Sequence, residues 1–188
     1  EFSFGFEYEE RKDYYWGAGP FNFWDRMRQL VNMHIEERDL NNPIPVLDAN
    51  GVYQDTVEYE RLFIEDNQSW FSKQFRKQVG LKADGLDYID IDSYSDLSVF
   101  DIKLFSPDEL LNNGGNLVGY YGYDIYGDKI SENATLDAFF HDKDDNDNYL
   151  RHIAPFNPIY TAGYIQDKFA IDDLIFNIGL RVDRYDAN

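Results

Sequence analysis

The sequence predicts a mainly β fold: a fragment of an antiparallel transmembrane β-barrel that carries a large extracellular region of mixed helices and strands. One observation is strict alternation near the C-terminus. The alternate apolar residues, expected to face lipid, are Leu174, Phe176, Ile178, Leu180 and Val182. A second is that Asn177, Arg181 and Asp183 lie between them and are expected to face a polar lumen. A third is length, because a tilted strand needs roughly 9–11 residues to cross a bilayer.

The strands are expected at the two ends of the chain. At residues 1–13, Phe2, Phe4, Phe6 and Tyr8 alternate with polar residues or glycine, which predicts a strand. We assign it to the barrel, although this segment alone fits an ordinary amphipathic strand equally well. Residues 158–188 are expected to form a transmembrane hairpin. Its two strands are joined only by Asp172 and Asp173, and a turn that short makes them antiparallel neighbours.

The intervening residues 14–157 predict a loop region with short helices at about 22–40, 69–79, 106–113 and 135–141. Asn22 is the expected cap of the first helix, and Ser106 with Glu109 matches a capping box for the third. Asn50-Gly51 suits a type I′ hairpin turn. Residues 86–105 alternate irregularly, which suggests strand, and no internal repeat is visible.

The order of these elements favours a barrel. One strand precedes a long mixed segment, and a strand, a tight turn and another strand follow it. Outer-membrane barrels have short periplasmic turns and long outer loops. The order therefore fits one strand that runs outward, a large outer loop, a strand that runs inward, a periplasmic turn and a second outward strand. Because the smallest barrels have about 8 strands, we expect a fragment that the rest of a barrel completes.

Composition narrows the classes of function. The net charge of −19, from 36 acidic and 17 basic residues, argues against nucleic acid as a partner. Aromatic residues make up 18%, so the chain is expected to fold although it is acidic. It has no cysteine, which excludes disulfides and thiolate metal sites. No apolar run approaches the roughly 18 residues of a transmembrane helix, and no signal peptide is visible.

Two groups of residues are candidates for binding. Tyr120, Tyr121, Tyr123 and Tyr126, together with Trp70, offer stacking faces for a sugar or peptide, although they suit a small loop core equally well. Trp24, on the apolar stripe of a helix, favours the core. The residues Asp142, Asp144 and Asn146 resemble part of a calcium loop. The EF-hand spacing fails, so a solvated acidic loop is favoured and calcium, the only cofactor considered, is a minority hypothesis.

Catalytic patterns are weak. Asp90 and Asp92 would share one face of a strand, as paired carboxylates do in glycosidases, but coincidence is the better explanation in so acidic a chain. His34, His141 and His152 lack metal-ligand spacing, and His34 is expected to be packed. No nucleophile elbow, phosphate loop or zinc motif occurs. We therefore expect no enzymatic activity.

Two segments also resemble a known family. The stretch Pro155–Phe169, with Tyr164-Ile165-Gln166-Asp167, is similar to the barrel-entry strand of TonB-dependent outer-membrane receptors. The stretch Asp173–Asp186, with Gly179-Leu180-Arg181-Val182-Asp183, is similar to their recurrent hairpin. The resemblance is to the Bacteroidota type with a carboxypeptidase-regulatory-like N-terminal domain. Ile89–Tyr94 and Leu104–Asn112 resemble its loop region more loosely.

The resemblance implies a plugged 22-strand barrel in the outer membrane of a Gram-negative bacterium, importing a scarce solute such as a siderophore, glycan or peptide. It implies as partners the remaining barrel and plug, TonB through a segment absent here, membrane lipid and, as an open question, a surface lipoprotein. One alternative is a soluble or surface-anchored module that binds glycan or peptide without transport. A weaker one is a structural component of an outer-membrane secretion or motility complex.

Overall fold

The computed structural model describes residues 1–130 and 134–187, which form two compact units. The sheet unit comprises Glu1–Gly17, Gly119–Asp142 and Leu150–Asn188, and the helical unit comprises Ala18–Val118 and Lys143–Tyr149. Strands make up about one third of the chain and pair in antiparallel sheets, so the fold is mixed helix and strand rather than mainly β. Asn188, in the expected hairpin, and residues 131–133, in the expected loop region, lie outside the described residues.

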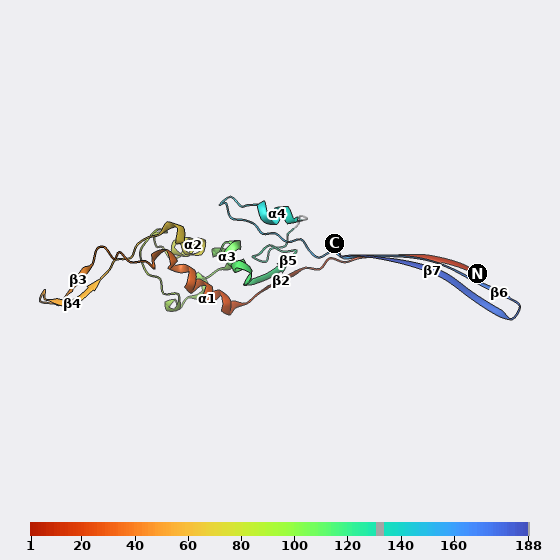
Figure 1. The fold of residues 1–188 in the computed structure, drawn as a ribbon, viewed down its shortest axis with the longest axis horizontal. Helices are drawn as coiled ribbons and strands as arrows, with labels where there is room; N and C mark the ends of the chain where they lie inside the picture. Colours follow the sequence, from red (N-terminus) through yellow and green to blue (C-terminus); the bar gives the residue numbers. More distant parts are fainter. Residues whose placement is uncertain (131–133, 188) are drawn as a thin grey trace. The chain divides into compact units, whose positions relative to one another are not determined.

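Three long strands form the main sheet of the sheet unit, in the order β1-β6-β7 (Figure 1). They are β1 (Phe2–Glu10), β6 (Ile159–Ile171) and β7 (Leu174–Asp186). Both neighbouring pairs are antiparallel, and Ile171 pairs directly with Leu174, so that Asp172 and Asp173 alone make the turn. The chain therefore has a strand within residues 1–13 and an antiparallel hairpin within 158–188, as the alternation and the short turn predict.

The register aligns alternate side chains of all three strands on the same two faces. We call one the apolar face. Its apolar members are Phe2, Phe4, Phe6, Ile165, Phe169, Ile171, Leu174, Phe176, Ile178, Leu180 and Val182. We call the other the polar face. Its members include Glu7, Glu9, Tyr160, Tyr164, Asn177, Arg181, Asp183 and Tyr185. The residues expected to face lipid and those expected to face a lumen therefore lie on opposite faces.

In the described part of the chain, four α-helices overlap the four predicted helical ranges, and each is shorter than predicted. They are α1 (Pro20–Val31), α2 (Trp70–Gln78), α3 (Pro107–Leu111) and α4 (Leu136–His141). Six 3₁₀ turns lie among the described residues. They are η1 (Met33–Ile35), η2 (Glu65–Asn67), η3 (Ile91–Ser93), η4 (Leu97–Val99), η5 (Ile102–Leu104) and η6 (Asn112–Gly114). Short strands complete the set. They are β2 (Tyr15–Ala18), which pairs with β5 (Val118–Tyr121), and β3 (Ile44–Leu47), which pairs with β4 (Tyr53–Glu58).

The expected cap at Asn22 is wrong. Helix α1 begins at Pro20, with Gly19 as its N-cap and no side-chain cap. Proline is favoured in the first turn because its fixed φ suits a helix and its missing N–H has no partner there anyway. The backbone N–H of Asn22 instead donates to the Gly19 carbonyl, 3.1 Å away. The capping box at Ser106 and Glu109 is confirmed, and Glu109 also accepts the backbone N–H of Phe71, which ties α3 to the start of α2.

The expected strand at 86–105 is wrong, and a short repeat takes its place. Three segments each begin with an aspartate that caps a 3₁₀ turn by accepting the N–H two residues on, and each ends with an aromatic residue. The capping aspartates are Asp90, Asp96 and Asp101, and the aromatic residues are Tyr94, Phe100 and Phe105. These rings pack on α2: Tyr94 and Phe100 contact Phe75 at 5.3 Å between centroids, and Phe105 contacts Phe71 at 4.4 Å. The acidic, irregular segment thus supplies much of the aromatic core of the helical unit.

The hairpin between β3 and β4 forms, but its turn is not type I′. That type needs positive φ at both central residues, whereas only Gly51 has one, at 79°. The Asp48 side chain instead accepts the backbone N–H groups of Asn50, at 2.8 Å, and Val52, at 2.9 Å. These bonds hold the pKa of Asp48 below its ordinary value. The turn is therefore closed by the side chain of Asp48, which lies outside the Asn-Gly pair from which the turn type was predicted.

Candidate functional site

The apolar face of the β1-β6-β7 sheet is exposed along its whole length. Its apolar side chains are between 38% and 76% accessible, with Phe169 at the lower limit and Phe6 at the upper. At the hairpin end, Phe169 and Phe176 stack on each other with ring centroids 5.4 Å apart. Asp167 is the one charged residue within this band, opposite Phe2 and Ile178. The face is therefore a continuous oily surface without a protein cover among the described residues.

The polar face carries a network of hydrogen bonds and ion pairs centred on Arg181. Its guanidinium group contacts Glu7 of β1 at 3.0 Å and Asp183 of β7 at 2.9 Å. It also donates to the hydroxyl of Tyr160 at 2.6 Å, and that hydroxyl donates to Asp183. One cation therefore pairs with carboxylates of β1 and β7, and the Tyr160 hydroxyl of β6 joins the network. Asn177, which we expected on the same surface, lies on this face nearer the turn and pairs with Lys168.

A close approach on the polar face requires glycine at position 5. An added Cβ on Gly5 would lie 2.3 Å from the ring of Tyr164, which pairs with Gly5 across the strands. The Tyr164 ring therefore lies over β1 where any larger residue would displace it. An aromatic ring that covers a glycine of the neighbouring strand helps to pin the register of a sheet.

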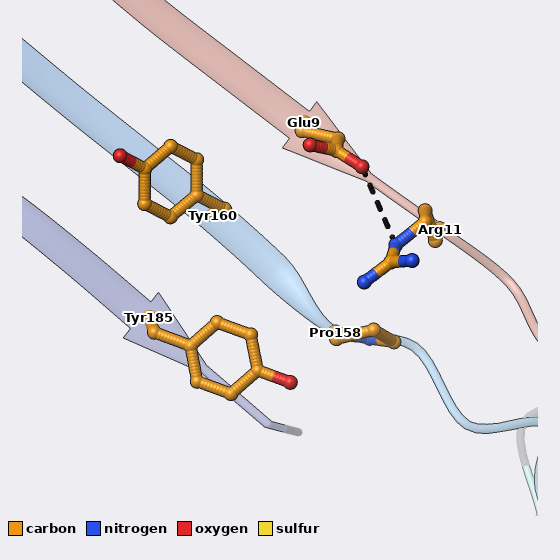
Figure 2. Close-up of a pocket in the computed structure, with 5 residues that line it drawn as sticks. All are labelled: Glu9, Arg11, Pro158, Tyr160 and Tyr185. Atoms are coloured by element: carbon orange, nitrogen blue, oxygen red, sulfur yellow. Dashed lines mark ion pairs between the residues drawn. The ribbon is translucent and has the colours of Figure 1, made fainter.

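A cavity of about 300 Å³ opens at the end of the polar face where the chain leaves β1 and returns to β6. Glu9, Tyr160 and Tyr185 form one row across the three strands, and Arg11 and Pro158 close the end of that row (Figure 2). Arg11 Nε lies 3.3 Å from Glu9 Oε1. Sequence reasoning missed this site, although Tyr185 continues the alternate positions of Arg181 and Asp183.

The tyrosines expected to bind ligand are each held by a different neighbour. Tyr120 is buried, and its hydroxyl donates to the Arg151 carbonyl. Tyr121 contacts Tyr15 at 5.8 Å between ring centroids, and Tyr123 contacts Tyr14 at 5.9 Å. Tyr126 is half-buried in the turn after Asp124, whose side chain accepts its N–H. Trp70, also half-buried, opens α2 in the other unit. These contacts favour a local aromatic core over a single binding face.

The acidic loop suggested for calcium is closed by its own backbone. Asp144 Oδ1 accepts the N–H groups of Asn146 and Asn148, both at 2.9 Å, the arrangement also seen around Asp48. Hydrogen bonds from the loop backbone hold the pKa of the exposed Asp144 below its ordinary value and outweigh the effect of desolvation. Within residues 1–130 and 134–187, no group of three or more acidic or histidine side chains is placed to hold a metal. Asp142 therefore belongs to no such group. Calcium stays a hypothesis, to be tested by calorimetry at millimolar calcium.

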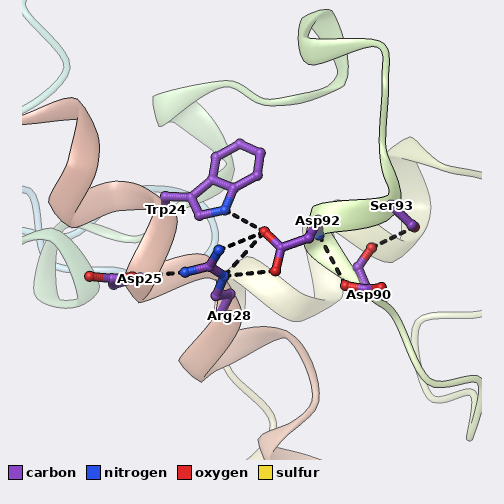
Figure 3. A network of polar contacts seen from close by, with 6 residues as sticks. All are labelled: Trp24, Asp25, Arg28, Asp90, Asp92 and Ser93. Atoms are coloured by element: carbon purple, nitrogen blue, oxygen red, sulfur yellow. Dashed lines mark hydrogen bonds and ion pairs between the residues drawn. The ribbon is translucent and has the colours of Figure 1, made fainter.

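The acidic pair Asp90 and Asp92 has structural roles (Figure 3). Asp90 caps η3 by accepting the N–H of Asp92 at 3.1 Å. Asp92 in turn accepts the indole N–H of Trp24 at 2.6 Å and pairs with Arg28 at 2.7 Å. The Arg28 hydrogen bonds lower the pKa of Asp92. The prediction that the two carboxylates share one face of a strand is wrong, and Trp24, packed edge-on against Phe100, belongs to the core as expected.

The helical unit buries two titratable basic side chains, those of His34 and Arg76. His34 is fully buried and packs edge-on against Phe63, and Arg76 is fully buried in α2. Arg76 Nη2 donates to the Asp87 carbonyl at 2.6 Å, but its Nε and Nη1 and both ring nitrogens of His34 have no hydrogen-bond partner among the described residues. Burial and the neighbouring charge of Arg76 lower the pKa of His34 to about 4.

The helical unit should lose stability as the pH falls from 6.5 to 4. Unfolded His34 takes up a proton near pH 6.5 and the folded ring only near 4, so the unfolded state binds more protons in this window. The expected loss is at most about 3 kcal/mol. Urea unfolding followed by the fluorescence of Trp24 and Trp70 at pH 7 and pH 4.5 measures it. His34→Leu should lose markedly less than the parent, and an equal loss in both would exclude His34 as the cause.

None of the described helices is long and apolar enough to cross a membrane. Comparisons with protein families, with curated proteins and with solved structures found no match to this chain. The functional argument therefore rests on the two faces of the β1-β6-β7 sheet and on the cavity at its end.

Proposed function

We propose that the chain is part of a TonB-dependent outer-membrane receptor that imports a scarce solute such as a siderophore, glycan or peptide. In this proposal β1, β6 and β7 are neighbouring strands of the barrel wall, and residues 14–157 form an extracellular loop region. The observation that carries the proposal is one sheet with a continuous exposed apolar face and an ion-paired polar face. The proposed role is binding and transport, without catalysis.

The exposure of the apolar face supports lipid as its cover. Contiguous exposed apolar patches larger than a few hundred Å² are rare on soluble monomers and mark contact surfaces. Leu174, Phe176, Ile178 and Leu180 would count against a membrane role if they were buried under protein, but all four are exposed. Lipid tails would remove them from water without any further protein layer.

The height of the apolar band suits a bilayer. From Leu174 to Val182 the band spans four steps of two residues, or about 26 Å along the strand at roughly 3.3 Å per residue. A barrel strand tilts by about 35–45°, which reduces this to about 20 Å, close to the roughly 25 Å apolar band of outer-membrane barrels. Tyr8 and Arg184 follow directly above the band, where amphipathic and charged side chains meet lipid headgroups.

The polar face and the strand order support the same proposal. A barrel lumen is polar, and the Arg181 network pairs charged side chains of β1 and β7 on the face that would line it. The two-residue turn at Asp172 and Asp173 suits the periplasmic side, and the long connection between β1 and β6 suits the outside. Within the described residues, β1 and β7 each pair along one edge only, so further strands of a barrel have two edges to join.

Single-cysteine labelling in the outer membrane tests the proposal. These 188 residues contain no cysteine, so each introduced thiol is the only one in this segment. In the full-length receptor, Phe176→Cys and Ile178→Cys should resist a water-soluble maleimide, and a lipid-borne nitroxide should quench a fluorophore attached there. Asn177→Cys, which lies between them on the polar face, should show neither effect. Labelling in urea gives the reference for full reactivity.

A different labelling pattern would contradict the proposal. If all three cysteines reacted equally in the native protein and none were quenched by lipid, the apolar face would not lie in a membrane. The protein would then fit the soluble or surface-anchored binding module better, particularly if it also fractionated without detergent as a monomer.

A further inference from the structure

We propose that the cavity lined by Glu9, Arg11, Pro158, Tyr160 and Tyr185 is a binding subsite for a neutral, hydroxyl-rich ligand, namely one sugar ring of an oligosaccharide. The inference rests on the proposed function and narrows its range of solutes. In the proposed barrel the cavity would lie on the lumen side of the wall, at the end nearest the outer loops. A solute captured outside would pass it on entering the lumen.

The two tyrosines form the floor of the cavity. Tyr160 and Tyr185 pair directly across β6 and β7 on the polar face, and both line the cavity. The Tyr185 ring points toward Pro158, and the Tyr160 ring points the other way along the strands (Figure 2). The Tyr160 hydroxyl is held by Arg181 and Asp183, which fixes the ring before any ligand arrives. The Tyr185 side chain is 62% exposed and free to cover a ligand. One rigid and one accessible aromatic ring give a stacking surface at low entropic cost.

An ion pair forms the rim. Glu9 and Arg11 contact each other at 3.3 Å at the end of β1, and the backbone N–H of Arg11 donates to the Pro158 carbonyl at 3.2 Å. The backbone bond anchors this end of the strand, so the position of both side chains is set by the sheet. A carboxylate accepts and a guanidinium donates, so together they complement hydroxyl groups, which do both.

Charge argues for a neutral ligand. The positive charge of Arg11 is already matched by Glu9, and the chain as a whole carries −19, so an anionic ligand gains no attraction here. A cationic ligand would compete with Arg11 for the single carboxylate in the cavity. A sugar ring instead places its C–H face on a tyrosine and its hydroxyls on the rim. The volume of about 300 Å³ lies at the lower end of the range for small-molecule pockets and suits a single ring of a longer chain.

Calorimetry on the full-length receptor in detergent tests the subsite. The probes are maltohexaose, cellohexaose, xylohexaose and mannohexaose as neutral chains, with hexagalacturonate as the acidic comparison. At least one neutral probe should bind saturably and more tightly than the acidic one. Tyr185→Ala should weaken its affinity about 10-fold, equivalent to roughly 1.4 kcal/mol, and Tyr185→Phe should stay within about threefold of the parent because the stacking ring remains. Arg11→Met should weaken it by a similar factor, and Tyr53→Ala, an exposed strand tyrosine in the other unit, should leave it unchanged.

The subsite is overturned if no neutral probe binds, if the acidic probe binds more tightly, or if Tyr185→Ala binds like the parent. The cysteine labelling separates this failure from failure of the proposed function. If Phe176→Cys and Ile178→Cys are protected and Asn177→Cys is labelled, but Tyr185→Ala binds like the parent, only the subsite is refuted. Uniform labelling would remove the receptor assignment, and with it the placement of the cavity in a barrel lumen.

Discussion

Replacing Phe4 by arginine is expected to prevent stable insertion into a bilayer, whereas the same change at the adjacent Ser3 should be tolerated. Phe4 lies within the apolar face, one row from its middle, in the same row as Ile165 and Leu180. An arginine facing lipid near the midplane of a barrel costs about 2–4 kcal/mol. Ser3 lies on the polar face, in one row with Gln166 and Gly179, where a charged side chain can stay hydrated.

Folding into phospholipid vesicles measures the difference between these two variants. The folded fraction of the full-length protein is followed by its heat-dependent gel mobility and by urea titration. Both variants gain one arginine, at adjacent positions, so the added charge is the same in both and only the face that carries it differs. If both faces of the sheet were in water, the two variants would behave alike, and equal stabilities would refute the assignment of the apolar face to lipid.

Replacing Phe75 by alanine should destabilise the helical unit by about 3–5 kcal/mol, the usual cost of deleting a buried aromatic ring. Phe75 has no exposed surface and stacks on Phe71 at 5.5 Å and on Phe100 at 5.3 Å. Tyr94 packs edge-on against the same ring. Its removal would leave a cavity among rings from two separate segments, which α2 cannot close without moving.

Urea unfolding by tryptophan fluorescence measures this loss, and Phe21→Ala is its control. Phe21 is on the neighbouring helix α1 and is 87% exposed, so its truncation should change the free energy of unfolding by less than about 0.5 kcal/mol. If the two variants were equally stable, the aromatic cluster would not be the core of this unit. The 3₁₀ repeat at 90–105 would then have no packing role.

The strands could be predicted because their signal is local. Strict alternation from Phe2 and from Leu174 indicates two-sided strands, and a two-residue connection leaves only an antiparallel hairpin. The capping box at Ser106 was equally legible, since cap and partner lie three residues apart. These features depend on neighbours in sequence, so one chain without relatives is enough to find them.

The turns were predicted less well because several local solutions compete. Asn50-Gly51 permits a type I′ turn, but the Asp48 side chain closes the loop with a single left-handed residue. At 86–105, aspartates that cap 3₁₀ turns compete with strand formation by bonding the backbone two residues ahead. The alternation of residue types cannot show which of these hydrogen bonds forms.

The candidate site shows the same division. The sequence placed Arg181 and Asp183 on one face, but their partners Glu7 and Tyr160 come from strands that only the register brings alongside. The tyrosines near residue 120 stand out in the sequence by their number, yet Tyr121 and Tyr123 pack on Tyr15 and Tyr14. The rings that line a cavity are Tyr160 and Tyr185, which are far apart in the sequence.

By itself, the sequence determined where the long strands and the four α-helices lie and which side of each long strand is oily, because side-chain alternation and caps act over a few residues. Tertiary structure decided which strands are neighbours in register, how an acidic segment supplies the aromatic core, and which two tyrosines share a cavity. Those outcomes depend on contacts between residues tens to more than a hundred positions apart, whose free energy appears only once the chain has folded.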